Sequence, residues 1–357
     1  MSNIEVGLVL SGGGAKGAYH VGVLKALLEM GVRINAIAGA SIGALNGAVL
    51  ASAPSLKVGV ERMDNLWNTL ANTPPLAPHF PAYLHLLLAA GLRINKLDYI
   101  VQLAGLKQAE GIGIPFILEL LSVGLLSSNP LIRLMEQYFD PDALEHGLPL
   151  YVSVFKSCGP LEDTLMVLMA ESGILESPES EFLHIQRLPK DQQKDALLGS
   201  AAIPLLFAPR HLNNSIYSDG GIGGWQRMQG NTPVTPLLQA GINTLIVTHL
   251  CDGSLWSRHD FPEAMILEIR PQSPIGRSGG LSDLLGFDAH KIPSWIEQGY
   301  RDTLHCVGRV IEATTVRNKL RFSEAKLNND EDQFMMLDKD LSEAMGRLEN
   351  PSGYSEK

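Results

Sequence analysis

The pentapeptide Gly39-Ala40-Ser41-Ile42-Gly43 lies where a short strand is expected to turn into a helix. Residues 35–38 before it are typical of a buried strand, and residues 44–50 after it are typical of a helix. A G-x-S-x-G pattern in that setting holds its serine on a sharp turn, so it predicts a nucleophile at Ser41. The helix start beneath Ser41 favours negative charge there. The competing interpretation is an ordinary glycine-rich turn capped by serine.

A second glycine cluster, Ser11-Gly12-Gly13-Gly14-Ala15-Lys16-Gly17, follows a predicted buried strand at residues 4–10. Residues 18–30 after it have the apolar spacing of a helix. A glycine loop at a helix start presents bare backbone N–H groups to an anion. In an acyl-transfer enzyme that anion is the tetrahedral oxyanion, so the loop predicts an oxyanion hole.

Gly12, Gly14 and Gly17 also satisfy the G-x-G-x-x-G pattern of dinucleotide-binding folds. That pattern requires an acidic residue about 20 positions further on, to bind the ribose. The second predicted strand ends instead at residues 38–41, Ala-Gly-Ala-Ser. A phosphate-binding Walker loop is also excluded, because Lys16 is followed by glycine rather than by serine or threonine.

Asp219-Gly220-Gly221 ends a third predicted strand, at residues 216–218. A carboxylate at a strand end, followed by glycines, can point across an open site. The competing interpretation is a plain Asp-Gly turn, which is common.

These three motifs, in this order and separation, resemble those of the patatin-like phospholipases, over roughly residues 4–250 with a gap in the middle. The stretches 200–204, Ser-Ala-Ala-Ile-Pro, and 231–234, Asn-Thr-Pro-Val, support the resemblance. The resemblance implies that Ser41 is the nucleophile, that Asp219 is its partner in a Ser-Asp dyad, and that the amides of Gly12, Gly13 and Gly14 form the oxyanion hole. The resemblance also implies that six residues support these motifs: Lys16, Gly17, Gly39, Gly43, Gly220 and Gly221.

A Ser-Asp dyad needs an unusually basic aspartate, because a carboxylate with an ordinary pKa accepts a proton poorly at neutral pH. Burial of Asp219 could raise its pKa into the working range. The alternative is a Ser-His-Asp triad, which the ten histidines leave open. We interpret His20 as a packed or half-buried helix residue and His249 as a strand-end residue.

Composition narrows the remaining classes of protein. Of 357 residues, 45% are hydrophobic and only 6% aromatic, which favours an aliphatic α/β core. Cys158, Cys251 and Cys306 are too widely spaced for a disulfide framework or a metal site, and the chemistry requires neither metal nor cofactor. A net charge of −10 disfavours a nucleic-acid polymer as a partner. The N-terminus lacks signal-peptide features and no apolar run reaches membrane-spanning length, so we expect a cytoplasmic protein, or one peripheral to the inner membrane surface.

The predicted fold is a three-layer α/β/α domain with a mostly parallel central sheet, over residues 1–322. A helical insertion is expected at about residues 53–128, where leucine-rich runs alternate with prolines. It is either a lid that faces lipid or extra core packing. Further strands are expected at residues 150–156, 165–170, 245–249 and 265–269, and helices at 190–198 and 293–320.

Residues 323–357 are expected to form a C-terminal tail. An acidic break at residues 328–332 precedes an amphipathic helix, whose apolar residues recur at helical spacing as Phe334, Leu337, Leu341, Met345 and Leu348. That apolar face should dock on the protein's own core or on a neighbouring subunit.

Taken with the resemblance, these features predict hydrolysis of acyl esters of glycerophospholipids or lysophospholipids through an acyl-serine intermediate. The expected partners are a lipid or acyl-ester substrate and, transiently, a membrane surface. A homo-oligomer and a small-molecule activator are left open. The alternatives are a soluble esterase or thioesterase, a phospholipase effector switched on by a partner or second messenger, and a non-catalytic binding protein, which the presence of both Ser41 and Asp219 disfavours.

Overall fold

The computed structural model describes residues 5–72, 133, 136–204, 206–251, 253, 255–276 and 286–349. The chain divides into two units, one comprising Glu5–Gly308 and one that contains the helix from Arg309 to Glu349.

The first unit is built on one sheet with the strand order β5-β6-β3-β2-β1-β7-β8, and β4 also pairs with β3. The four central pairings, β1 with β2, β1 with β7, β2 with β3 and β7 with β8, are all parallel, whereas β4, β5 and β6 pair antiparallel. The mostly parallel sheet is therefore confirmed. The strands are β1 Glu5–Leu10, β2 Arg33–Ala40, β3 Leu150–Lys156, β4 Glu181–His184, β5 Arg210–Leu212, β6 Ser215–Asp219, β7 Thr244–Thr248 and β8 Met265–Ile269.

Helices cover both faces of this sheet, because successive side chains of a strand point to opposite faces. On β2, Ala36 and Ala38 belong to a buried cluster with Val234 and Leu237, at the start of α11. Ile37, between them, faces the other way, toward Gly47 of α2. The helices of this unit are α1 Ala18–Glu29, α2 Ile42–Ala51, α3 Leu56–Asn72, α8 Pro141–Leu144, α9 Pro160–Glu171, α10 Lys190–Ser200, α11 Thr235–Gln239 and α13 Lys291–Thr303. These three layers agree with the predicted architecture.

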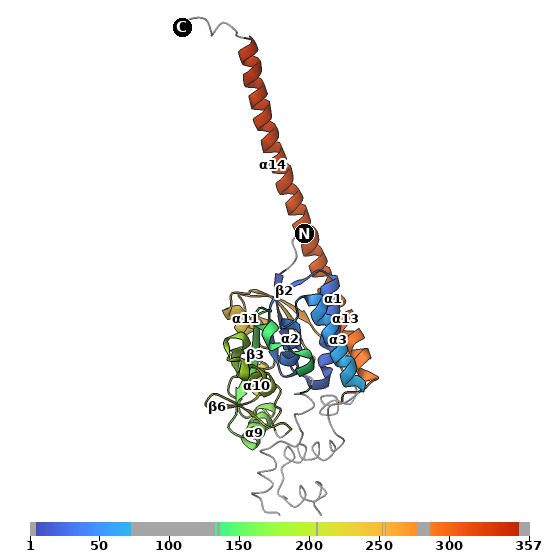
Figure 1. The fold of residues 1–357 in the computed structure, drawn as a ribbon, viewed down its shortest axis with the longest axis vertical. Coiled ribbons are helices and arrows are strands. Elements are labelled where there is room, and N and C mark those ends of the chain that lie inside the picture. The colour runs from blue at the N-terminus through green and yellow to red at the C-terminus, as the bar shows by residue number, and fades with distance from the viewer. Residues whose placement is uncertain are drawn as a thin grey trace, which may run out of the picture. The chain divides into compact units, whose positions relative to one another are not determined.

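Helices α1, α3 and α13 gather on one side of the unit (Figure 1). Two glycines let α1 and α13 approach closely: a Cβ at Gly22 would lie 1.8 Å from the Ile296 carbonyl oxygen, and a Cβ at Gly299 would lie 2.1 Å from that of Tyr19. Backbone-to-backbone contact of this kind fixes the position of α1, and α1 follows the glycine loop directly.

The prediction of a strand at residues 165–170 is wrong, since these residues lie within α9. The segment is rich in leucine, methionine and alanine, which favour helix, and it contains only one β-branched residue. Leu165 is 56% exposed, so the segment lies on the surface and is not an inner strand.

Only the first part of the predicted insertion at about residues 53–128 falls within the described residues. Residues 56–72 form the regular helix α3, which buries Met63, Trp67 and Leu70 in the core. The leucine-rich runs expected to form a lid, at residues 83–90 and 112–121, lie outside the described residues.

The predicted break at residues 328–332 is also wrong. After α13 and a π-helical turn at Leu304–Gly308, helix α14 runs without interruption from Arg309 to Glu349 (Figure 1). Each asparagine or aspartate costs a helix only roughly a few tenths of a kcal/mol relative to alanine, and residues 328–332 contain no glycine or proline. None of the described helices combines the length and the apolar composition that crossing a bilayer requires.

Candidate active site

Ser41 occupies a strained turn between β2 and α2. Its φ of 51° and ψ of −124° lie in a region that non-glycine residues rarely adopt. Glycines on both sides allow the turn, because a Cβ at Gly39 would lie 2.5 Å from the Gly43 carbonyl oxygen and a Cβ at Gly43 would lie 2.0 Å from that of Leu10. The ends of β1 and β2 and the start of α2 therefore meet backbone to backbone, with Ser41 at their junction.

Asp219 lies at the end of β6, with the Ser41 side chain beside its carboxyl group. The carboxylate accepts a hydrogen bond from the Gly221 amide, at 2.8 Å. Both side chains are largely shielded, with Ser41 7% and Asp219 5% exposed. Two residues that are far apart in the sequence are thus brought beside each other.

Burial raises the pKa of Asp219 to about 6, although the hydrogen bonds from Ser41 and Gly221 act in the opposite direction. The carboxyl group is then mostly ionised at neutral pH, yet it is a stronger base than an ordinary aspartate. These are the properties of a group that can accept a proton from the serine hydroxyl.

The glycine loop packs against the serine. A Cβ at Gly12 would lie 3.1 Å from the Ser41 Cβ and 2.4 Å from the Asn231 Oδ1. The Gly12 amide already donates to the Asn231 carbonyl oxygen, at 3.3 Å. The amides of Gly13 and Gly14 have no acceptor among the described residues, and both glycines are partly exposed. Of the three amides expected in an oxyanion hole, two are therefore available to a ligand and that of Gly12 is occupied.

The two residues after this loop contribute in different ways. Lys16 lies in a 3-10 turn at Gly14–Gly17, and its ammonium forms no ion pair with any residue in the described part of the chain. Gly17 lets the turn close on the residue after the serine, because a Cβ there would lie 2.6 Å from the Ile42 Cγ1. Its carbonyl oxygen accepts a hydrogen bond from the Asn46 side chain of α2, at 3.0 Å.

The end of α10 contacts both Ser41 and Asp219, whereas the sequence indicated residues 200–204 only as support for the resemblance and assigned them no contact in the site. The Ser41 amide donates to the Ser200 Oγ at 3.0 Å, and the Asp219 amide donates to the Ala202 carbonyl oxygen at 2.9 Å. One short segment thus sets the backbone of both residues. No local pattern in the sequence indicates such contacts, because the partners of Ser200 and Ala202 lie in other elements.

Serine hydroxyls also hold the turn that follows Asp219. The Gly220 carbonyl oxygen accepts hydrogen bonds from Ser180 at 2.7 Å and from Ser153 at 3.3 Å. A Cβ at Gly220 would lie 2.1 Å from the Ser153 carbonyl oxygen, so only glycine fits there. Gly221, next in the turn, donates to the carboxylate itself. The Asp-Gly-Gly sequence is therefore a close-packed support for the carboxylate.

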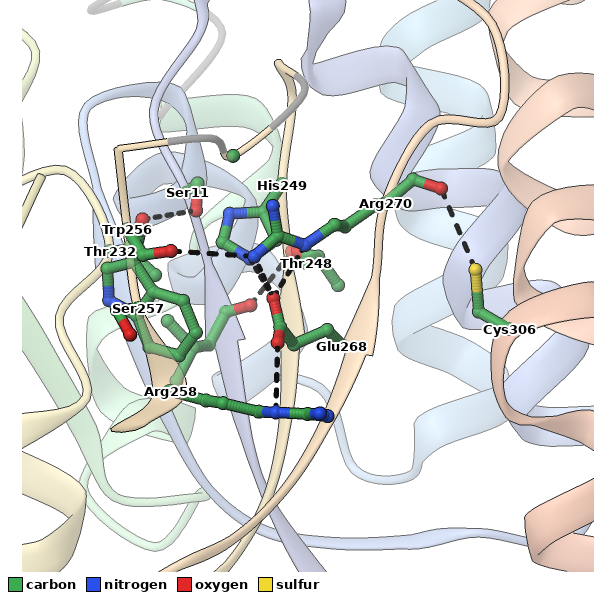
Figure 2. Close-up of polar contacts among 12 residues, drawn as sticks. Ser11, Thr232, Thr248, His249, Trp256, Ser257, Arg258, Glu268, Arg270 and Cys306 are labelled. Atoms are coloured by element: carbon green, nitrogen blue, oxygen red, sulfur yellow. Dashed lines mark hydrogen bonds and ion pairs between the residues drawn. The ribbon is translucent and has the colours of Figure 1, made fainter. Parts of the chain in front are cut away.

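No histidine in the described part of the chain forms a hydrogen bond with Ser41. His20 is fully buried in α1, where its Nδ1 contacts the Asn46 side chain, and burial lowers the pKa of His20 to about 3. His249 follows β7 and contacts the Glu268 carboxylate at 3.2 Å (Figure 2). Both histidines lie where the sequence placed them, one packed in a helix and one at a strand end.

Glu268 is the centre of this second polar cluster (Figure 2). Burial raises the pKa of Glu268, but hydrogen bonds from His249 and Arg270 outweigh that effect and bring the pKa below its ordinary value. The hydrogen bonds from His249 and Arg270 thus favour the ionised form of the Glu268 carboxylate. No described group of three or more histidine, cysteine, aspartate or glutamate side chains has an arrangement that could bind a metal ion.

Comparison with known proteins locates the chain in a family. A family model described as patatin-like phospholipase matches residues 8–238. Patatin-like phospholipase domain-containing protein ZK370.4 of Caenorhabditis elegans is 38% identical over 97 residues, covering 25% of this chain and 7% of that protein. Neuropathy target esterase sws of Drosophila persimilis is 57% identical over 48 residues, covering 13% of this chain and 3% of that protein. The matched segments are therefore small parts of these relatives.

Solved structures with a similar arrangement include VipD from Legionella pneumophila, at a TM-score of 0.40 and 17% identity, covering 85% of this chain and 67% of that one. The ExoU–SpcU complex of Pseudomonas aeruginosa gives a TM-score of 0.34 at 16% identity, covering 87% of this chain and 52% of the matched one. The family match extends over well more than half of the chain and includes both the Ser41 turn and the Asp219 turn, and the chain therefore belongs to the patatin-like phospholipase family.

Proposed function

We propose that this protein is a serine acyl hydrolase that cleaves acyl esters of glycerophospholipids or lysophospholipids with a Ser41–Asp219 dyad. The observation that carries the proposal is that a serine on a strained turn lies beside a buried aspartate whose pKa is raised to about 6. The family membership and the esterase name of one relative support the same class of reaction.

In the proposed first half-reaction, Asp219 accepts the proton of the Ser41 hydroxyl as Oγ attacks the carbonyl carbon of the ester. The amides of Gly13 and Gly14 donate hydrogen bonds to the resulting oxyanion. The tetrahedral intermediate then collapses, the ester C–O bond breaks, and the departing alcohol takes the proton from Asp219. Ser41 is left as an acyl ester.

In the second half-reaction, Asp219 accepts a proton from a water molecule that attacks the acyl-serine. The same two amides stabilise the second oxyanion, and the free fatty acid leaves as the proton returns to Ser41. Every step uses groups of this chain and water, so the proposed reaction requires no cofactor. We further propose that the protein acts in the cytoplasm, with transient contact at the inner membrane surface.

The test is to incubate the purified protein with diacyl phospholipid vesicles, lysophospholipid micelles and a short soluble ester, together with a serine-directed fluorophosphonate. We expect release of fatty acid from the lipids and labelling of Ser41. Ser41→Ala should reduce turnover by roughly three decades or more and abolish labelling. The matched control is Ser52→Ala, a buried serine at the end of α2 whose hydroxyl bonds the Val49 carbonyl oxygen.

Each result discriminates among the alternatives. Activity on the short ester without activity on either lipid would replace the phospholipase proposal with a soluble esterase. Retained turnover in Ser41→Ala, or labelling at another serine, would rule out the proposed nucleophile.

A further inference from the structure

Helix α14 carries a seven-residue repeat. Ala313, Leu320, Leu327, Phe334 and Leu341 recur at every seventh position. Val316 and Leu337 lie three residues after a member of this series, so the apolar spacing alternates between three and four at the two ends of the repeat. An average period of 3.5 residues is that of a left-handed coiled coil, in which these positions are named a and d. The repeat extends over roughly 40 Å of helix.

This stripe has no cover in the described part of the chain. Leu320, Leu327, Phe334 and Leu341 are between 58% and 71% exposed. A long helix gains most of its stability in water from packing an apolar face, and isolated helices are marginal. A largely apolar stripe on an exposed helix therefore indicates a partner that the described residues do not supply.

We propose that α14 pairs with the α14 of a second copy of this chain, as a parallel, in-register coiled-coil dimer. Charges beside the stripe select a second copy as the partner. In such a dimer each g position faces the e position of the following heptad on the other helix. Glu312 then faces the partner's Arg317, Lys319 faces the partner's Glu324, and Lys326 faces the partner's Glu331. All three pairs are of opposite charge, and each occurs twice by symmetry.

The remaining flanking positions do not oppose this arrangement. Gln333 faces the partner's Asp338, and Asp340 faces the partner's Met345, so no like charges meet. An antiparallel pair would instead set e positions against e positions. Because Glu324, Glu331 and Asp338 all occupy e positions, an antiparallel pair would bring carboxylates together.

Two d positions are polar, Ser323 and Asp330. In a parallel pair the two Asp330 carboxylates face each other across the seam, which weakens the association while fixing its register. A single substitution at Asp330 should therefore strengthen the association of the two helices. Replacing Asp330 with leucine removes the repulsion and leaves Ser323 as the one polar d position of this repeat.

The first experiment is sedimentation equilibrium of the full-length chain over a range of concentrations. We expect a reversible dimer for the wild type, at least tenfold tighter association for Asp330→Leu, and a monomer for Leu320→Asp with Leu341→Asp. The matched control is Met335→Asp with Met336→Asp, which changes two exposed methionines at b and c positions of the same helix. This control should still form dimers.

Trp67, Trp225, Trp256 and Trp295 all lie outside α14, so near-ultraviolet circular dichroism reports separately whether the first unit is folded. A wild type that stays monomeric at 100 µM would overturn the proposal. A stripe variant that dimerises like the wild type, or a b/c control that dissociates as fully as the stripe variant, would overturn it as well.

The second experiment exchanges charges. Lys319→Glu with Lys326→Glu should weaken self-association at least tenfold, and so should Glu324→Lys with Glu331→Lys, since each creates like-charge pairs. An equimolar mixture of the two should form heterodimers detectable by native mass spectrometry, because every swapped pair is again opposite in charge. Heterodimer formation also shows that both variants are folded. Two variants that remain monomeric when mixed would contradict the predicted pairing.

The third experiment tests orientation. In a parallel pair the d residue Ser323 faces its own copy, so Ser323→Cys should form an intermolecular disulfide under mild oxidation. Ser342→Cys, at a b position on the outside, is the matched control and should remain reduced. Dimers of Ser323→Cys that form no disulfide at this position, or equal cross-linking of the two variants, would rule out the parallel arrangement.

Discussion

The turn around Ser41 and the helix α14 differ in where their partners lie. At the turn, the backbone groups are held by segments remote in sequence: the Ser41 amide by Ser200, the Gly12 amide by Asn231, and the Asp219 amide by Ala202. Along α14, the side chains carry a regular pattern whose complement lies outside the described chain. The geometry of the site therefore depends on contacts within the chain, whereas the proposed role of α14 depends on association between chains.

The largest effect is expected from Asp219→Asn. An amide preserves the shape and can still accept from Gly221, but it cannot take the serine proton, so turnover should fall by roughly two to four decades. Asp332→Asn, an exposed aspartate of α14, should leave turnover unchanged. Steady-state kinetics on the preferred ester measure both. Full activity in Asp219→Asn would show that another group is the base.

The same substitution should stabilise the fold at neutral pH. The folded pKa of Asp219, about 6, lies above its unfolded value, so the folded state binds the proton more tightly. Ionisation of the buried carboxyl group therefore lowers the free energy of unfolding. This loss of stability is absent below about pH 4, grows between about pH 4 and 6, and is fully present above pH 6. A difference of about two between the folded and unfolded pKa values corresponds to an energy on the order of 3 kcal/mol, which Asp219→Asn should largely recover in urea unfolding at pH 8. An unchanged or reduced stability would contradict this.

The pH dependence of kcat/KM should report the ionisation of Asp219. Since Asp219 must be ionised to accept the proton, kcat/KM should rise through an apparent pKa of about 6 and fall about tenfold per unit below it. Self-association of α14 does not involve Asp219, so a dimer variant such as Leu320→Asp with Leu341→Asp should keep this profile. A histidine substitution that removed the titration would instead favour a triad.

Two glycine-to-alanine substitutions compare the regions directly. Gly43→Ala places a Cβ 2.0 Å from the Leu10 carbonyl oxygen and should cost about 2–3 kcal/mol of unfolding free energy. Gly346→Ala has open space around it within α14 and should stabilise that helix by about 0.5–1 kcal/mol. Chemical denaturation followed by far-ultraviolet circular dichroism gives both values. The two substitutions should change the free energy of unfolding in opposite directions. Changes in the same direction would show that packing density does not distinguish the two regions.

The smallest loss of activity is expected from Ser200→Ala, which removes the acceptor of the Ser41 amide. Because this residue positions the turn without touching the reacting atoms, kcat should fall about tenfold, or about 1.4 kcal/mol, with KM unchanged. Ser200→Thr keeps the hydroxyl and should restore most of kcat. A change in KM alone, or no rescue by threonine, would argue against positioning.

The sequence by itself determined the elements that depend on local pattern. The apolar runs of β1, β2, β3, β7 and β8, the glycine-flanked turn at Ser41 and the Asp-Gly-Gly strand end were all visible in it. The amphipathic character of the C-terminal helix was visible too, because helical periodicity is a property of neighbouring residues. Local composition misled where it was ambiguous: an apolar run at residues 165–170 suits helix as well as strand, and the acidic stretch at 328–332 does not break a helix.

Only the tertiary structure decided how the site is assembled. That Ser41 reaches Asp219, that burial raises the pKa of this carboxyl group to about 6, and that Ser200 holds the Ser41 amide all depend on distant segments meeting. The availability of the Gly13 and Gly14 amides, and the loss of the Gly12 amide to Asn231, likewise depend on which carbonyl happens to lie opposite. Hydrogen bonds between remote segments, and the desolvation that accompanies them, leave no periodic trace in a sequence, because they arise only when the chain is folded.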